Sequence, residues 1–197
     1  DPGAKGNVPD TAAERQRTFV EAQEFVVRRV TESLARVPAE TVRRIIDLLA
    51  KAPAIFVYGA GRSGIIGRAF AMRLVQTGLT AYVIGESVTP IVRAGDAVFI
   101  LSGRGESYSS IQTANIVRRE GAQLIVLTGK GGSKLAHAAS ISVVLDFAED
   151  PGQPRLAPLG TLFESASLRF TDALIAELMA VRGETEDSMR RRHAIMV

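Results

Sequence analysis

Residues 54–64 read AIFVYGAGRSG and join an apolar segment to a glycine-rich turn. The apolar part, residues 54–58, has the length of a buried strand, and the glycines allow the chain to turn sharply into a helix. Four more short apolar segments alternate with longer segments that fit helices. They are residues 81–84, 97–101, 124–127 and 141–145. This alternation predicts a single doubly wound α/β domain of the flavodoxin-like kind, with a five-stranded parallel sheet flanked by helices.

Helices are also expected before the first strand. Phe19, Val26 and Leu34 belong to an apolar stripe with three- and four-residue spacing, which predicts an amphipathic helix over residues 11–37. Pro38 suits the first turn of a second helix. The remaining expectations are helices over residues 63–77, 107–120 and 133–139, a loop over 88–95, a linker over 149–158 and a long helix over 159–181.

The composition fits one domain with a substantial core, since 46% of the 197 residues are hydrophobic. The absence of cysteine excludes disulfides, thiolate metal sites and a cysteine nucleophile. No apolar segment reaches the roughly 18 residues that span a bilayer, so we expect a cytoplasmic protein without a membrane segment. The 24 basic and 21 acidic residues describe a mixed surface, which does not indicate nucleic-acid binding. We expect a disordered tail over residues 1–10 and one domain over 11–197, with an N-terminal helix pair and a C-terminal helical segment.

Two loops that follow strands have the composition of an anion site. In an open α/β sheet, ligands bind beyond the carboxyl ends of the strands. In the first loop, Gly61 lets the backbone approach an anion, and Ser63 stands where the following helix offers free N–H groups. The second loop reads SGRGES and contains Ser102, Gly103 and Ser107 before another helix. If the two strands are neighbours, one phosphate could be held by both loops.

A dinucleotide site is the alternative for the first loop. Residues 59–64 match G-x-G-x-x-G, and Glu86 follows the next strand, where such domains keep an acid for the ribose. The hydroxyls of Ser63, Ser102 and Ser107 favour a phosphate monoester instead, and little chain remains for a second domain that would hold a hydride acceptor. Simple tight turns would explain either loop alone more easily than both together.

Four motifs resemble one known family. YGAGRSG at 58–64, SGRGES at 102–107, PLGTLFE at 158–164 and RRHA at 191–194 are similar to the 6-phospho-3-hexuloisomerases, a group within the sugar isomerase (SIS) domain family. The two serine-glycine loops mark SIS domains in general, and the last two motifs favour the hexuloisomerases. The resemblance implies an SIS-type fold and an isomerase that interconverts D-arabino-3-hexulose 6-phosphate and D-fructose 6-phosphate. That reaction belongs to the ribulose monophosphate pathway of formaldehyde fixation.

The resemblance also implies roles for individual residues. It places Ser63, Ser102 and Ser107 on the substrate phosphate and makes Glu164 the catalytic base. It puts His193 in the active site, contributed by a neighbouring subunit of a homotetramer. Arg104 departs from the family pattern, in which a small hydroxyl residue is more common, so its role stays open between phosphate binding and an outward orientation.

The chemistry of such a reaction fits these side chains. Moving a carbonyl between C3 and C2 passes through a cis-enediolate, and one carboxylate can make both proton transfers. Arg62 could reach the phosphate or the substrate hydroxyls, although an ion pair between subunits would also explain it. A helix-starting carboxylate is the plain alternative for Glu164, and an ordinary surface residue for His193. We expect neither a cofactor nor a metal, since no acidic cluster flanks His137 or His193.

Two other functions share these loops. One is a non-catalytic sugar-phosphate sensor, which would bind the ligand and signal to a partner, although we recognise no helix-turn-helix segment. The other is an aldose–ketose isomerase that acts at C1 and C2 of a different sugar phosphate. The loop sequences do not distinguish these from the hexuloisomerase.

Overall fold

The structure, a computed structural model, describes residues 11–195 and contains a sheet in which every neighbouring pair of strands is parallel. The strands are β1 (Ile55–Gly59), β2 (Ala81–Val83), β3 (Ala97–Ser102), β4 (Gln123–Thr128) and β5 (Ile141–Val144). Their order across the sheet is β2-β1-β3-β4-β5. Since the chain reverses its direction across the sheet between β1 and β3, the carboxyl ends of these two strands form the switch point at which doubly wound sheets bind ligands.

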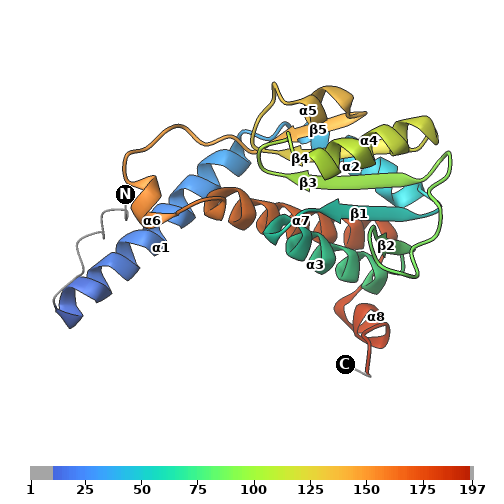
Figure 1. The fold of residues 1–197 in the computed structure, drawn as a ribbon. Coiled ribbons are helices and arrows are strands. Elements are labelled where there is room, and N and C mark those ends of the chain that lie inside the picture. Colours follow the sequence, from blue (N-terminus) through green and yellow to red (C-terminus); the bar gives the residue numbers. More distant parts are fainter. Residues whose placement is uncertain (1–10, 196–197) are drawn as a thin grey trace.

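Helices cover both faces of the sheet (Figure 1). The pair α4 (Tyr108–Arg119) and α5 (Lys134–Ala138) lies on one face, and α2 (Ala39–Lys51), α3 (Arg62–Gln76) and α7 (Thr161–Arg182) lie on the other. The remaining helices are α1 (Ala12–Ala35), α6 (Gln153–Leu156) and α8 (Glu186–Arg191). The protein is therefore a three-layer α/β domain to which α1 and α8 are attached at opposite ends.

The alternation of side chains along each strand divides the core in two. In β3, Val98 and Ile100 join the apolar cluster under α4 and α5, while Phe99 and Leu101 join the cluster under α3 and α7. Successive side chains of a strand point to opposite faces, and every residue of β3 is buried because helices cover both faces. This is the reason why the central strands read as continuous apolar segments.

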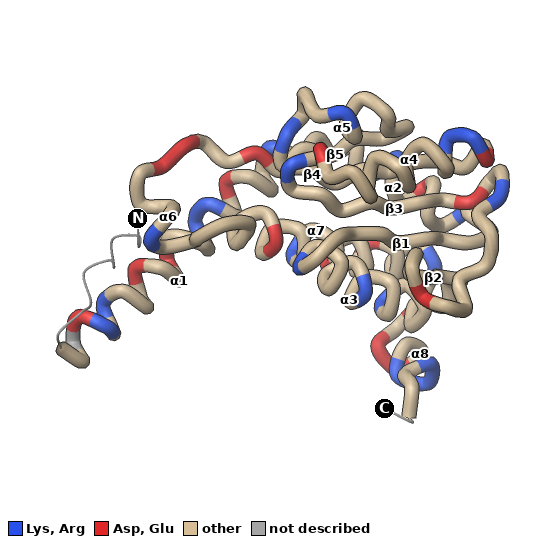
Figure 2. Tube along the Cα trace, in the orientation of Figure 1, with Lys and Arg blue, Asp and Glu red and all other residues tan. Residues whose placement is uncertain are grey.

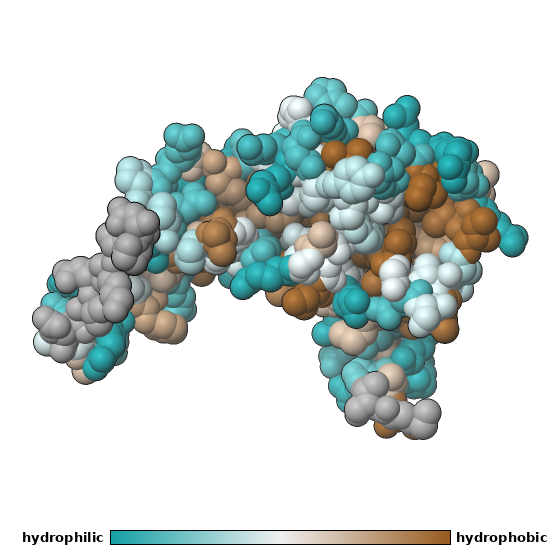
Figure 3. Space-filling view, in the orientation of Figure 1, coloured by the Kyte–Doolittle hydropathy of each residue, from teal (hydrophilic) through white to brown (hydrophobic). Residues whose placement is uncertain are grey.

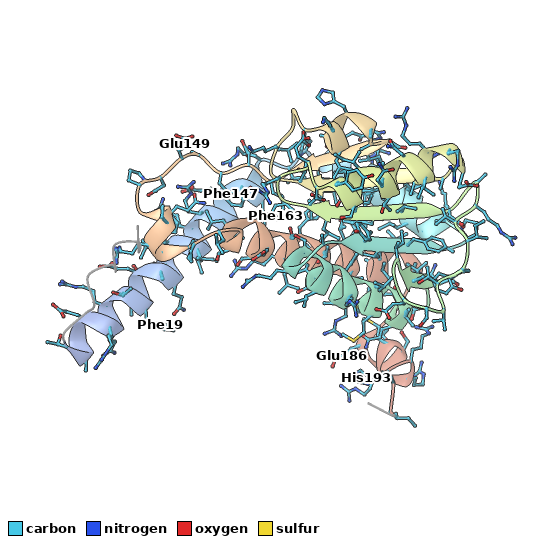
Figure 4. The ribbon with its side chains drawn as sticks, viewed as in Figure 1. Phe19, Phe147, Glu149, Phe163, Glu186 and His193 are labelled. Carbon is cyan, nitrogen blue, oxygen red and sulfur yellow. The ribbon has the colours of Figure 1, made fainter. Side chains whose placement is uncertain are left out.

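The helix α1 begins with a capping box, in which Thr11 and Glu14 satisfy each other's backbone N–H groups. The helix contacts α6 and α7, and its N-terminal half extends away from the sheet (Figure 1). Phe19 on this half is 68% exposed, and Figure 4 shows it away from the sheet. The first helix thus buries only part of its apolar stripe within this chain.

The surface carries both charges and residual apolar patches. Lys and Arg alternate with Asp and Glu along the chain rather than collecting on one face (Figure 2). Hydrophobic patches remain on the side of the molecule that carries α3 (Figure 3), and Ile65 and Met72 of this helix are 67% and 52% exposed. No helix in the described part of the chain is long and apolar enough to cross a membrane.

The predicted fold is confirmed: the five strands, their parallel arrangement and the flanking helices are all present within residues 11–195. Two local predictions were wrong. Pro38 is the N-cap of α2 in an extended conformation rather than a residue of its first turn. The linker over residues 149–158 contains α6, in which a proline occupies the first turn. The predicted disordered tail, residues 1–10, lies outside the described residues.

Candidate active site

A cavity of about 690 Å³ opens at the carboxyl edge of the sheet. Three loops that follow β1, β3 and β4 form one side of it, and the N-terminal turn of α7 forms the other. Phe147 and Phe163 line the cavity as well, and Figure 4 shows them near each other at this end of the sheet. The cavity therefore lies where the strand order β2-β1-β3 predicts a ligand site.

The predicted serines meet in this cavity. Ser63, Ser102 and Ser107 all line it, together with Gly103. Because β1 and β3 are adjacent parallel strands, their following loops lie side by side, as the shared-anion prediction required. Ser63 stands in the first turn of α3 and Ser107 is the N-cap of α4, so two helix N-termini with free N–H groups face the same space.

Glycine is required at two positions of the first loop for different reasons. Gly61 has a φ of 59°, a left-handed conformation that side chains disfavour, and caps α3. A side chain on Gly59 would collide with the backbone of Ser63 and Gly64, since its Cβ would lie 2.8 Å from the Gly64 nitrogen. The strand and the helix thus approach each other more closely than any other residue would allow. Gly61 itself does not line the cavity, whereas Gly103 does.

Glu164 faces the cavity from the first turn of α7, and its side chain is only 14% exposed. Its Oε2 lies 2.5 Å from Nε of Arg62, a side chain that is 71% exposed. The ion pair joins α7 to the first turn of α3 within one chain, so Arg62 has an acidic partner without a second subunit. A carboxylate that is nearly buried, ion-paired and in the same cavity as two helix N-termini is well placed for proton transfer.

The space around the Glu164 carboxylate depends on Gly160. The Cβ of any other residue at position 160 would lie 2.9 Å from Oε1 of Glu164. The preceding residue, Leu159, is 98% exposed and has a φ of 56°, which is uncommon for a non-glycine residue. Strained backbone of this kind often accompanies functional sites.

Sequence reasoning missed the third loop of the cavity. Gly129 and Lys130 follow β4 and line the cavity, and the Gly129 N–H donates a 2.9 Å hydrogen bond to the Gly103 carbonyl. The signal was present, because residues 128–132 read TGKGG directly after a predicted strand. The aromatic wall, Phe147 and Phe163, had no such signal, since an apolar residue near a cavity resembles any core residue in sequence.

His193 does not line the cavity of its own chain. It is exposed and follows α8, and Figure 4 shows it below the sheet, away from Phe147 and Phe163. His137 is also outside the cavity, with its Nδ1 at 2.8 Å from the carbonyl oxygen of Ser133. Within residues 11–195, no group of three or more His, Asp and Glu side chains is placed to hold a metal ion.

The sheet, the loops and the cavity agree with a match to one protein family. The SIS domain family matches residues 48–182. The chain belongs to the SIS domain family. The matched range begins just before β1 and ends with the last residue of α7, so this SIS domain includes the whole sheet and every loop of the cavity.

Two curated relatives cover nearly the same length as this SIS domain protein. An uncharacterised protein of Archaeoglobus fulgidus is 40% identical over 177 residues, which are 88% of this chain and 97% of the relative. The 3-hexulose-6-phosphate isomerase of Methylomonas aminofaciens is 35% identical over 174 residues, which are 87% of this chain and 96% of the relative. The likeness to the hexuloisomerases that the motifs predicted is thereby confirmed across most of the chain.

A solved structure agrees with this likeness. A protein of Methanococcus jannaschii, whose crystal structure was described as inferring a 3-hexulose-6-phosphate isomerase, superposes with a TM-score of 0.81 and 28% identity. The alignment covers 90% of this chain and 99% of the other. The fold of this SIS domain protein is therefore shared over most of its length.

Proposed function

We propose that this SIS domain protein is an isomerase that interconverts D-arabino-3-hexulose 6-phosphate and D-fructose 6-phosphate. The observation that carries the proposal is the placement of the Glu164 carboxylate in the same cavity as three serines from two loops at the switch point of the sheet. Relatives named for this activity, at 33% and 35% identity over most of their length, support the choice of substrate. The corresponding pathway is the ribulose monophosphate route of formaldehyde fixation.

One part of the cavity would bind the phosphate of the substrate, and another would carry out proton transfer. The phosphate accepts hydrogen bonds from Ser63, Ser102 and Ser107 and from the N–H groups at the starts of α3 and α4. Glu164 then removes the proton from C2 of the 3-hexulose, which gives a cis-enediolate; a proton passes from O2 to O3, and Glu164 returns its proton to C3. Arg62, which pairs with Glu164, carries the positive charge nearest to the base and can stabilise the developing oxyanion.

His193 enters the proposal through a second copy of the chain. It lies far from its own cavity, at the end of a helix that projects from the domain (Figures 1 and 4). Exposed apolar side chains on the contacting helices α3 and α7, namely Ile65, Met72 and Leu168, offer a surface for such a copy. We propose a homo-oligomer, with the tetramer expected from the resemblance, in which His193 completes a neighbouring cavity. A cytoplasmic location stays a prediction.

The first test is proton NMR of fructose 6-phosphate incubated with the protein in D₂O, with Glu164→Gln as the control. Deuterium entry at C3, or formation of the 3-hexulose, is expected with the wild type and is lost in the variant. Exchange at C1 would instead identify a 1,2-isomerase. Tight binding of fructose 6-phosphate without exchange or product would favour the sensor, once internal proton return without solvent exchange is excluded by following product formation.

The shared site has its own test. We expect Glu164→Gln and His193→Ala to be inactive separately and to regain activity when the two variants are unfolded and refolded together. A mixed oligomer then contains cavities that have both native residues. Activity of His193→Ala alone at the wild-type level would remove His193 from the site, and inactivity of every mixture would place His193 and Glu164 in the same chain's site.

A further inference from the structure

Two glycines that line the cavity are hydrogen-bonded to each other, and each is followed by a cationic residue. The Gly129 N–H donates to the Gly103 carbonyl over 2.9 Å, which ties the loop after β4 to the loop after β3. The next residue in each loop is basic: Arg104 follows Gly103, and Lys130 follows Gly129. Both line the cavity and both are exposed. The two loops thus bring two positive charges to one side of the site.

Neither charge has an acidic partner in the described chain. Among residues 11–195, no ion pair involves Arg104 or Lys130 and neither side chain makes a hydrogen bond; the only side-chain contact of the Lys130 backbone is its N–H, which donates to Thr128 Oγ1. The neighbouring cations differ, because Arg62 pairs with Glu164 and Lys134 lies 3.9 Å from Glu106. Two like charges on adjacent loops repel each other, and a dianion between them would remove that repulsion.

The groups between the two loops are suited to the same anion. Ser102 is 7% exposed at the end of β3 and lines the cavity with Ser107. Hydroxyls supply directional hydrogen bonds but no charge, whereas an arginine binds phosphate oxygens through a planar fork and a lysine acts as a point charge. A phosphate monoester with two negative charges uses both kinds of group.

We propose that Arg104 and Lys130 form a cation pair that binds the phosphate of the substrate and sets the preference of the cavity for a phosphate dianion over a neutral sugar. This inference rests on the proposed function for the identity of the sugar. It assigns Arg104, whose role the sequence left open, to the phosphate, and it adds Lys130 to the site.

The test compares Arg104→Ser, Lys130→Asn and the double variant with the wild type. Each single change is expected to raise KM for fructose 6-phosphate about tenfold, as for the loss of one charge-assisted hydrogen bond at an open site, with kcat changed less than about twofold. The double variant is expected to raise KM about a hundredfold. Added salt should weaken the wild type strongly and the double variant little, because the screened charges are absent from the latter.

The matched control is the double variant Lys51→Asn with Arg118→Ser, which removes the same two charges. Lys51 ends α2 before β1 begins, and Arg118 lies in the last turn of α4, so both belong to the opposite edge of the sheet. Its KM and salt dependence should match the wild type. Equal melting temperatures of all variants would show that each one folds.

Calorimetry with inorganic phosphate separates this inference from the proposed function. If the wild type turns over fructose 6-phosphate and binds inorganic phosphate, and the Arg104/Lys130 double variant no longer binds phosphate, the cation pair and the isomerase proposal are both supported. If the wild type turns nothing over but binds phosphate through these two residues, the cation pair stands and the isomerase proposal fails. If the double variant keeps the wild-type KM and phosphate affinity at low salt, the cation pair is overturned.

Discussion

The two ends of α7 use the same three residue types for different purposes. At its start, Gly160 precedes Glu164, whose carboxylate pairs with Arg62 at 2.5 Å. At its end, Gly183 precedes Glu184, whose carboxylate pairs with Arg192 at 2.8 Å. The first ion pair borders the cavity, and the second holds the α8 segment against the domain.

The reason for a glycine differs between these ends. Gly183 has a φ of 66° and open space around its absent side chain, so it is required by backbone conformation alone. Gly160 has a φ of −88°, which any residue adopts, but a Cβ there would meet Oε1 of Glu164 at 2.9 Å. Gly183 terminates the helix, whereas Gly160 leaves space for the Glu164 carboxylate. A glycine in a motif therefore has to be interpreted together with the atoms that its missing side chain would contact.

The largest expected effect distinguishes the glutamate in the cavity from a glutamate on the surface. Glu164→Gln should lower kcat by about 10² to 10⁴, since the amide cannot accept the substrate proton, with little change in melting temperature. Glu40→Gln, which breaks an exposed ion pair with Arg43 on α2, is the matched control and should keep the wild-type kcat. Steady-state kinetics on fructose 6-phosphate measures both. Full turnover by Glu164→Gln would show that this carboxylate is only a helix-starting residue.

The second prediction concerns Gly160→Ala. Because the backbone conformation tolerates alanine and the clash is with the end of a flexible side chain, the protein should fold with an unchanged or higher melting temperature. The displaced carboxylate should lower kcat about tenfold or more, since small errors in the position of a reacting group are costly. Wild-type kcat in this variant would mean that the observed carboxylate position is not required for turnover.

The third prediction concerns Gly183, at the C-terminal end of α7, where an alanine should lower stability. Gly183→Ala should reduce the free energy of unfolding by about 1 kcal/mol, because alanine is strained in the left-handed conformation even where space is open. Urea unfolding followed by circular dichroism measures the change. A loss of stability in Gly160→Ala instead of Gly183→Ala would contradict the distinction between the two glycines.

The smallest expected effect is a pH-dependent loosening of α8. Hydrogen bonds from Arg192 and then Ser188 lower the pKa of Glu184 from 4.5 to about 2. A lowered pKa in the folded state means that the ion pair stabilises α8 fully above about pH 4.5 and is lost as the pH falls through 2. The methyl resonance of Met189, which is 8% exposed, should shift within this window. Glu184→Gln should remove that transition, and its persistence would assign the change to another group.

Much of the fold followed from local patterns. The apolar segments of β1 to β5 had the right length and spacing, and the glycine-serine loops marked the carboxyl ends of β1 and β3. The same reasoning, applied to TGKGG after β4, would have added Lys130. Pro38 and α6 were misjudged because a proline fits both an N-cap and a first turn, and because a four-residue helix leaves too short a pattern to detect.

By itself, the sequence determined the doubly wound sheet, the two serine loops and the candidate carboxylate, since each depends on residues that are close together along the chain. Only the tertiary structure decided what those residues face. It paired Arg62 with Glu164 across α3 and α7, tied the loop of Arg104 to the loop of Lys130 through one backbone hydrogen bond, and placed His193 away from its own cavity. Those contacts join positions that are from 26 to 102 residues apart, and no local propensity encodes the packing that brings them together.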